Sequence, residues 1–117
     1  MILHIVPRAD WESARARGIC APPSLVAEGF IHCSTSAQIL HTANRFYRGQ
    51  PGLVILCIDE SRLEAAPRYE PPDSALNETP AGLFPHLYAP LNLDAVVRVV
   101  EFPCGADGTF KMPAALR

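Results

Sequence analysis

The sequence predicts a single α+β domain with a mainly antiparallel, split β-sheet and two helices. Strand-like and helix-like segments alternate in the first half of the chain, and short strand-like segments follow one another in the second half. No linker-like stretch interrupts residues 1–117, a length that suits one domain. The composition, 49% hydrophobic and 19% charged, excludes the disordered class.

Six short segments are typical of β-strands, because they are rich in β-branched and aromatic residues and end at turn-forming residues. They are Ile2–Val6, Phe30–His32, Leu53–Ile58, Arg68–Glu70, Leu83–Tyr88 and Ala95–Phe102. Leu53–Ile58 is apolar on both faces, which predicts a central strand. Pro85 predicts an edge or irregular position for its strand, and residues 109–112 are expected to add a final short strand after the Asp107-Gly108 turn.

Two segments are predicted to be helical. Residues 8–17 follow Pro7 and end before Gly18, a natural helix stop. Residues 36–48 form the second, and its start is marked by a capping box made by Thr35 and Gln38.

The second helix should bury a stripe made by Ile39, Ala43 and Phe46, with His41 facing solvent. Residues 19–28 are expected to be irregular, because Pro22-Pro23 precludes a regular helix or central strand there. Residues 71–82 are expected to form a loop.

The candidate site is the junction Gly29–Gln38, where a histidine-bearing strand runs into the start of a helix. His32, Cys33 and Ser34 precede backbone N–H groups that a helix leaves free, a geometry that suits phosphate or another anion. His4 and His86 also lie among apolar residues in strands, and three such histidines favour a shared site.

Charge and cysteine content restrict the partners and the location. The net charge is −2 and no Lys/Arg run occurs, which argues against extended duplex binding. No apolar run is long enough to span a membrane. Four cysteines without C-x-x-C spacing, in a chain whose start does not resemble a signal peptide, are expected to be free thiols in the cytoplasm.

Two other chemistries remain open for the same residues. Neutral imidazoles are good zinc ligands, although no H-x-x-x-H or C-x-x-C pair fixes two ligands locally. Cys33 would act as a nucleophile only with a neighbouring base, and strand alternation points it away from His32.

Several separated blocks, in order, closely resemble the bacterial family known as domain of unknown function 952. The blocks are GFIHCSTSAQILHTANRFYRG, LVILCID, RYE, LFPHLYAPLNLDAVVRVVEF and DGTFKMP. They extend over nearly the whole chain, and Ala89 departs from the glycine expected in the last histidine block. The family resembles the ADP-ribosyltransferase fold, which includes NAD-dependent RNA 2′-phosphotransferases.

That resemblance implies an ADP-ribosyltransferase-like split sheet that holds NAD in a histidine-lined cleft. It implies that His4 holds a ribose and that His32 lies near the nicotinamide. His86 falls where such enzymes often carry a glutamate, so Glu70 is the candidate substitute carboxylate. With His4 and His32, the residues expected to bind the cofactor are Ser34, Thr35 and Tyr88.

We therefore expect a protein that binds NAD or another nucleotide or phosphate ligand. It is a possible transferase, of ADP-ribosyl or 2′-phosphate type, with an RNA or protein substrate and with His32, His86 and Glu70 as catalytic residues. The alternatives are a non-catalytic module that binds a small anion or a partner, a metal-dependent hydrolase, and a structural domain whose histidines are merely buried.

Overall fold

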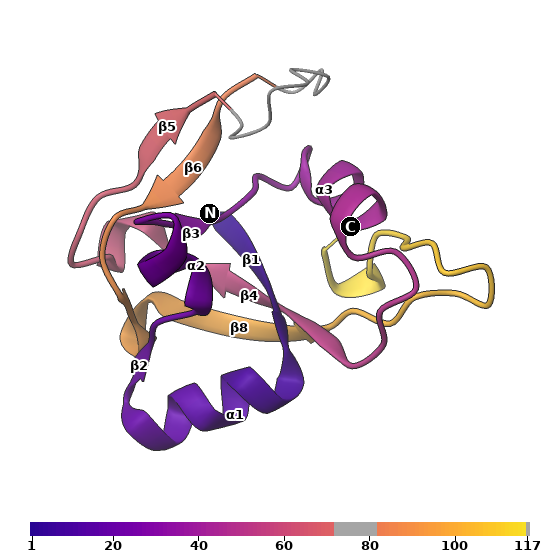
Figure 1. The fold of residues 1–117 in the computed structure, drawn as a ribbon, viewed down its shortest axis with the longest axis horizontal. Coiled ribbons are helices and arrows are strands. Elements are labelled where there is room, and N and C mark those ends of the chain that lie inside the picture. Colours follow the sequence, from indigo (N-terminus) through magenta and orange to yellow (C-terminus); the bar gives the residue numbers. More distant parts are fainter. Residues whose placement is uncertain (72–81, 117) are drawn as a thin grey trace.

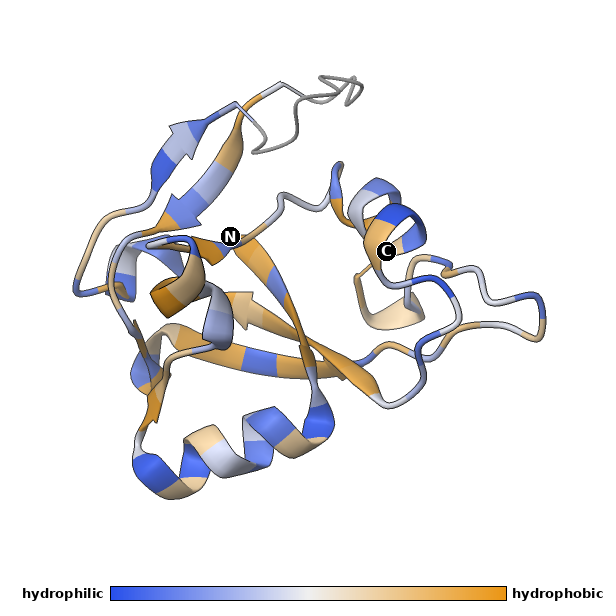
Figure 2. Ribbon diagram, viewed as in Figure 1, coloured by the Kyte–Doolittle hydropathy of each residue, from blue (hydrophilic) through white to orange (hydrophobic). Residues whose placement is uncertain are grey.

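The computed structural model describes residues 1–71 and 82–116, and at its centre lies a three-stranded antiparallel sheet (Figure 1). The strand order is β1-β4-β8, with β1 at Ile2–Pro7, β4 at Leu53–Ile58 and β8 at Val96–Glu101. Every residue of β4 is buried, which confirms the predicted central strand. Figure 2 shows hydrophobic residues along the length of this strand.

The central sheet separates two hydrophobic clusters, because alternate side chains of a strand point to opposite faces. On one face Val54 and Leu56 pack with α1 (Arg8–Arg17), which buries Trp11 and Ala14. On the other face Leu3, Ile5 and Ile55 pack with α3 (Ile39–Phe46) and with the C-terminal segment. The described part of the fold is thus an α+β arrangement with helices on both sides of a small sheet (Figure 1).

A second antiparallel sheet carries the predicted site, in the order β3-β6-β5. Its strands are β3 at Ile31–His32, β6 at Phe84–Leu87 and β5 at Arg68–Glu70. Ile31 pairs with Leu87, and both are buried in the cluster on the α1 side of the central sheet. A single bridge between Leu3 and Ser34 joins the end of β3 to β1.

Residues 19–28 contain more regular structure than the sequence indicates. Strand β2 (Ile19–Cys20) pairs with β7 (Leu91–Asn92), and helix α2 (Pro23–Ala27) follows it. The prediction that two prolines preclude a helix is wrong, because Pro23 occupies the first helical turn, where no intrahelical N–H donor is required. The described chain therefore has three α-helices rather than two.

Pro85 lies in the middle strand of its sheet, so the predicted edge position is wrong. The proline accepts a hydrogen bond from the Cys33 N–H through its carbonyl oxygen, at 3.1 Å. It has no N–H with which to return that bond, so the ladder stops beside it. This explains why β3 is only two residues long.

The second helix begins later than predicted. Residues 36–38 form a turn, in which the Gln38 side chain accepts a hydrogen bond from the Thr35 N–H. Phe46 is 62% exposed, so the predicted core stripe holds only for Ile39 and Ala43. His41 is half-buried, not solvent-facing, because its Nε2 atom lies inside the protein surface.

The C-terminal segment is held by a side chain instead of a strand ladder. Residues 109–112 form no strand, contrary to the prediction, and the Asn44 side chain bonds to both the N–H and the carbonyl of Phe110. A short 3-10 turn, η1 (Glu60–Arg62), follows β4, and two further 3-10 turns are η2 (Leu93–Ala95) and η3 (Ala114–Leu116). Most of the loop predicted at 71–82 lies outside the described residues.

Two further expectations can be compared with the structure. All four cysteines are free thiols, as predicted. Within residues 1–71 and 82–116, no helix has the length and apolar character needed to cross a membrane.

The central strand offers a matched test of the core. Val54 is fully buried, whereas Val26 on α2 is 91% exposed. We expect Val54→Ala to lower the free energy of unfolding by about 2 kcal/mol, because it removes two buried methyl groups and leaves a cavity. Val26→Ala should change it by less than about 0.5 kcal/mol. Urea denaturation of both variants checks this, and equal effects would contradict the assigned burial.

Candidate functional site

Two of the three predicted histidines lie side by side on one face of the β3-β6-β5 sheet. His32 is directly opposite His86, which in turn is directly opposite Arg68. Paired residues share a face, and so do residues two apart along a strand, which adds Glu70 to the same face. Tyr88, just after β6, joins it through a hydrogen bond from its hydroxyl to Glu70. We call this surface the histidine face.

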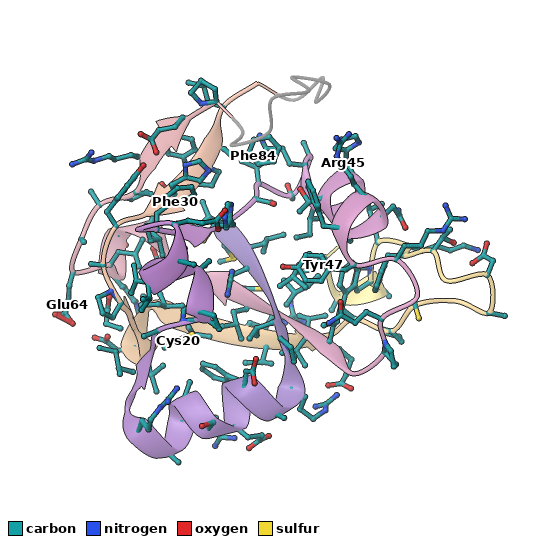
Figure 3. The ribbon with its side chains drawn as sticks, viewed as in Figure 1. Cys20, Phe30, Arg45, Tyr47, Glu64 and Phe84 are labelled. Carbon is teal, nitrogen blue, oxygen red and sulfur yellow. The ribbon has the colours of Figure 1, made fainter. Side chains whose placement is uncertain are left out.

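Aromatic rings pack closely around the two imidazoles. The Phe30 ring stacks on His86 with centroids 4.2 Å apart, and it lies 4.7 Å from His32 and 5.3 Å from Tyr88. The two imidazole centroids are 5.7 Å apart in an edge-on arrangement. Figure 3 labels Phe30 and Phe84 in this part of the molecule. The face thus combines apolar surface with two titratable rings.

Glu70 points onto the histidine face, a direction that the sequence left open. Its carboxylate accepts hydrogen bonds from the Tyr88 hydroxyl at 2.5 Å and from His86 Nδ1 at 2.9 Å. These two bonds, with the first making the larger contribution, hold the pKa of Glu70 below its usual value. Glu70 is therefore ionised at neutral pH, and His86 carries a proton on Nδ1.

His32 has a carboxylate partner that the sequence analysis missed. Its Nε2 atom donates to Glu28 at 2.5 Å, and both side chains are about two-fifths exposed. Glu28 is the residue that ends α2, four positions before His32. The four-residue spacing does not indicate this pair by itself, because Glu28 follows α2 and His32 lies in β3, and the turn between them brings the side chains together.

Arg68 supplies a positive charge at the rim of the face. Its guanidinium lies over the Tyr88 ring at 4.7 Å from the centroid, and Tyr88 is 42% exposed. The same guanidinium helps to lower the pKa of Glu70. An exposed aromatic ring and a cation therefore stand next to the imidazoles.

His4 contacts the backbone of the site from behind. Its Nδ1 atom donates to the carbonyl oxygen of His32 at 2.7 Å, and the residue is 6% exposed. Burial is the largest cause that lowers the pKa of His4, so the ring is neutral at pH 7. Its Nε2 atom is buried and has no hydrogen-bond partner in the described structure.

Three backbone N–H groups just ahead of α3 are engaged within the protein. The N–H groups of Cys33, Ser34 and Thr35 already bond to Pro85, Leu3 and the Gln38 side chain, respectively. The Ser34 hydroxyl is buried and donates to Thr42. An anion ahead of α3 therefore cannot use these three N–H groups or the Ser34 hydroxyl proton without displacing their present partners.

Cys33 has the environment of a structural thiol. It is buried in the hydrophobic cluster on the α1 side of the central sheet, and desolvation raises its pKa far above the usual value. A thiol that stays protonated is a poor nucleophile, so this alternative is not supported. For metals, no group of three His, Cys, Asp or Glu residues within 1–71 and 82–116 is arranged to hold an ion.

A hollow of about 380 Å³ on α3 lies apart from these residues. It is lined by Leu40, His41, Asn44 and Arg45.

The comparisons with known proteins agree with the resemblance that the sequence blocks indicate. Residues 5–99 match the family described as "Protein of unknown function (DUF952)". The chain belongs to this family. The comparison with curated proteins gives no match.

Solved structures of protein CC0527 from Caulobacter crescentus are similar to this chain. Two crystal structures, one of a double-methionine variant, are 33% and 32% identical, have a TM-score of 0.84, and match 98% of this chain and 96% of CC0527. A solution structure is 32% identical with a TM-score of 0.67, over 92% of this chain and 89% of CC0527. The likeness therefore extends over the fold as a whole.

The Glu70 bonds predict an acid-sensitive contribution to stability. A carboxyl whose pKa is depressed by folding stabilises the native state above its ordinary pKa, and this contribution is lost as the pH falls through the lowered value. We expect the melting temperature of the wild type to fall more than that of Glu70→Gln between pH 7 and pH 3. Glu12→Gln, which alters an exposed carboxylate on α1, should behave like the wild type.

The buried His4 predicts a second pH dependence, at a higher pH. Because its pKa is lowered in the folded state, only the unfolded chain takes up this proton as the pH falls below about 6.5, and stability is lost. His4→Asn keeps a donor near the His32 carbonyl but does not titrate. The difference in unfolding free energy between wild type and variant should shrink by up to about 1.4 kcal/mol per pH unit below 6.5. A constant difference from pH 7.5 to pH 5.5 would refute the assignment.

Proposed function

We propose that the histidine face binds NAD or a related nucleotide ligand, and that the protein is ADP-ribosyltransferase-like in this respect. The observation that carries the proposal is the convergence of two imidazoles, exposed aromatic surface and one guanidinium on a single face. Nucleotides combine an aromatic base, ribose hydroxyls and phosphate. Each of these has a matching group on this face.

The exposed groups suggest how such a ligand would lie. The Tyr88 ring can stack with a base or a nicotinamide, and Arg68 can pair with a phosphate. His32, whose side chain is 43% exposed, can reach a ribose hydroxyl or a phosphate oxygen. His4 would act from behind the face by fixing the carbonyl of His32.

Glu70 supports a transferase role within this proposal. Cleavage of the bond between nicotinamide and ribose builds positive charge on the ribose, and a nearby carboxylate stabilises that charge. His86 cannot supply a fixed negative charge, but Glu70 is ionised and is held on the same face through the His86 bond. In this proposal Glu70 stabilises the charge, His86 positions Glu70, His32 contacts the ligand, and the acceptor is an RNA or a protein.

A non-catalytic module is the second candidate. One oxygen of Glu70 already accepts from both Tyr88 and His86, an arrangement that also suits a purely structural bond. The same face would then hold a nucleotide or a small anion without turnover. A metal-dependent hydrolase is less well supported, because each histidine on the face pairs with a separate carboxylate and a third ligand is lacking among the described residues.

Isothermal titration with NAD and with ADP-ribose tests the binding proposal. We expect binding at up to millimolar concentration, and a loss of at least about tenfold in affinity for His32→Ala, equivalent to about 1.4 kcal/mol. His41→Ala, on α3, is the matched histidine control and should bind like the wild type. Failure of the wild type to bind either ligand at millimolar concentration would overturn the proposal.

Release of nicotinamide separates the transferase from the binding module. Turnover of NAD that is lost in Glu70→Gln, with ADP-ribose affinity retained, supports the transferase. Binding without any release of nicotinamide favours the module.

A further inference from the structure

The histidine face holds two carboxylate–imidazole pairs, and breaking a nicotinamide–ribose bond requires only one carboxylate. Glu70 pairs with His86, and Glu28 pairs with His32. Nicotinamide leaves as a neutral molecule and needs no proton from the protein. A second pair becomes useful in a reaction that must remove a proton at one atom and deliver one at another.

Hydrolysis of a phosphate ester is such a reaction. The attacking water must lose a proton, and the departing ribose oxygen must gain one because an alkoxide is a poor leaving group. Two imidazoles with centroids 5.7 Å apart, one buried and one exposed, are close enough to serve the two ends of one small phosphate group. Arg68 on the adjacent strand offers one positive charge, which matches the single negative charge of a phosphodiester.

We propose that His86 and His32 are the general base and the general acid for the hydrolysis of a ribonucleoside 2′,3′-cyclic phosphate. This inference rests on the proposed nucleotide binding of the same face and adds a substrate class and a reaction to it. The cyclic mononucleotide is preferred over an RNA strand, because a long strand needs a row of cations and this chain has no Lys/Arg run.

The hydrogen bonds assign the two roles. His86 donates from Nδ1 to the ionised Glu70, which leaves the lone pair of Nε2 to accept a proton. The Tyr88 hydroxyl fixes the same carboxylate oxygen, so the ring orientation of His86 is set. His32 donates from Nε2 to Glu28, so Nδ1 is the ring atom that remains to deliver a proton as the acid.

The step balances without a further reactant. Water attacks phosphorus as His86 Nε2 takes its proton, and a new P–O bond forms. The bond between phosphorus and the ribose 2′ oxygen breaks, the electron pair goes to that oxygen, and His32 Nδ1 delivers a proton to it. The product is the nucleoside 3′-phosphate, and exchange of one proton with solvent restores both imidazoles.

The roles of His86 as base and His32 as acid predict a bell-shaped dependence of the rate on pH. Glu28 faces His32 from the end of α2, Glu70 and Arg68 face His86 from β5, and Tyr88 directly follows β6. His4 adjoins the His32 carbonyl from β1 and is neutral. A base that must be unprotonated and an acid that must be protonated make activity fall at both low and high pH.

Phosphorus NMR of 2′,3′-cyclic AMP incubated with the full chain tests the inference. We expect conversion to adenosine 3′-phosphate, reduced by about 100-fold or more in His86→Asn and in His32→Asn. His32→Asn should remove the alkaline limb of the profile, and His86→Asn the acidic limb. His41→Asn and Glu12→Gln are the controls and should keep the wild-type profile.

Binding of ADP-ribose, measured on the same samples, distinguishes failure of the proposed nucleotide binding from failure of the proposed hydrolysis. Binding without conversion of the cyclic phosphate overturns this inference and leaves the proposed function standing. If the wild type neither binds ADP-ribose nor converts the cyclic phosphate, the proposed function and this inference are both overturned. Conversion that persists at the wild-type rate in the folded His86→Asn and His32→Asn variants, with circular dichroism like that of the wild type, also overturns the assignment.

Discussion

The register between β3 and β6 is the constraint on which the histidine face depends. His32 lies opposite His86, and Ile31 lies opposite Leu87, so one face is polar and the other joins the core. A shift of one residue would send every side chain of β3 to the opposite face. The apolar partners fix this register, because burying His32 in place of Ile31 would remove an imidazole from both solvent and Glu28.

Two features keep so short a strand in place. Pro85 ends the ladder between β3 and β6, because it lacks an N–H. The first feature is the bridge between Leu3 and Ser34, which joins the chain after β3 to β1. The second feature is His4, whose ring donates a hydrogen bond to the carbonyl oxygen of His32 in β3. The central sheet therefore positions the histidine face through one bridge and one buried side chain, and the burial of His4 is a structural requirement of the site.

The secondary structure of single segments could be predicted from the sequence. The pairing of one segment with another could not. The apolar run of β4, and Gly18 at the end of α1, are local signals that the structure confirms. The direction of Glu70 depends on how β5 pairs with β6, and nothing within residues 68–70 specifies that register. Glu28 was missed because its position beside His32 depends on the short helix α2. No helix was predicted there, on account of Pro22 and Pro23.

The energetics of the polar cluster indicate that it serves more than stability. Replacing buried, paired polar groups by apolar groups of similar volume is often neutral or stabilising, so such pairs are weak evidence of a structural need. His86 is 3% exposed and stacked on Phe30, in a place where a leucine or a phenylalanine would extend the apolar packing. The sequence instead places an imidazole there and surrounds it with an ionised carboxylate and a phenol. An oriented imidazole of this kind stabilises little but is suited to accept a proton, and this contrast is the physical reason to look for chemistry on the histidine face.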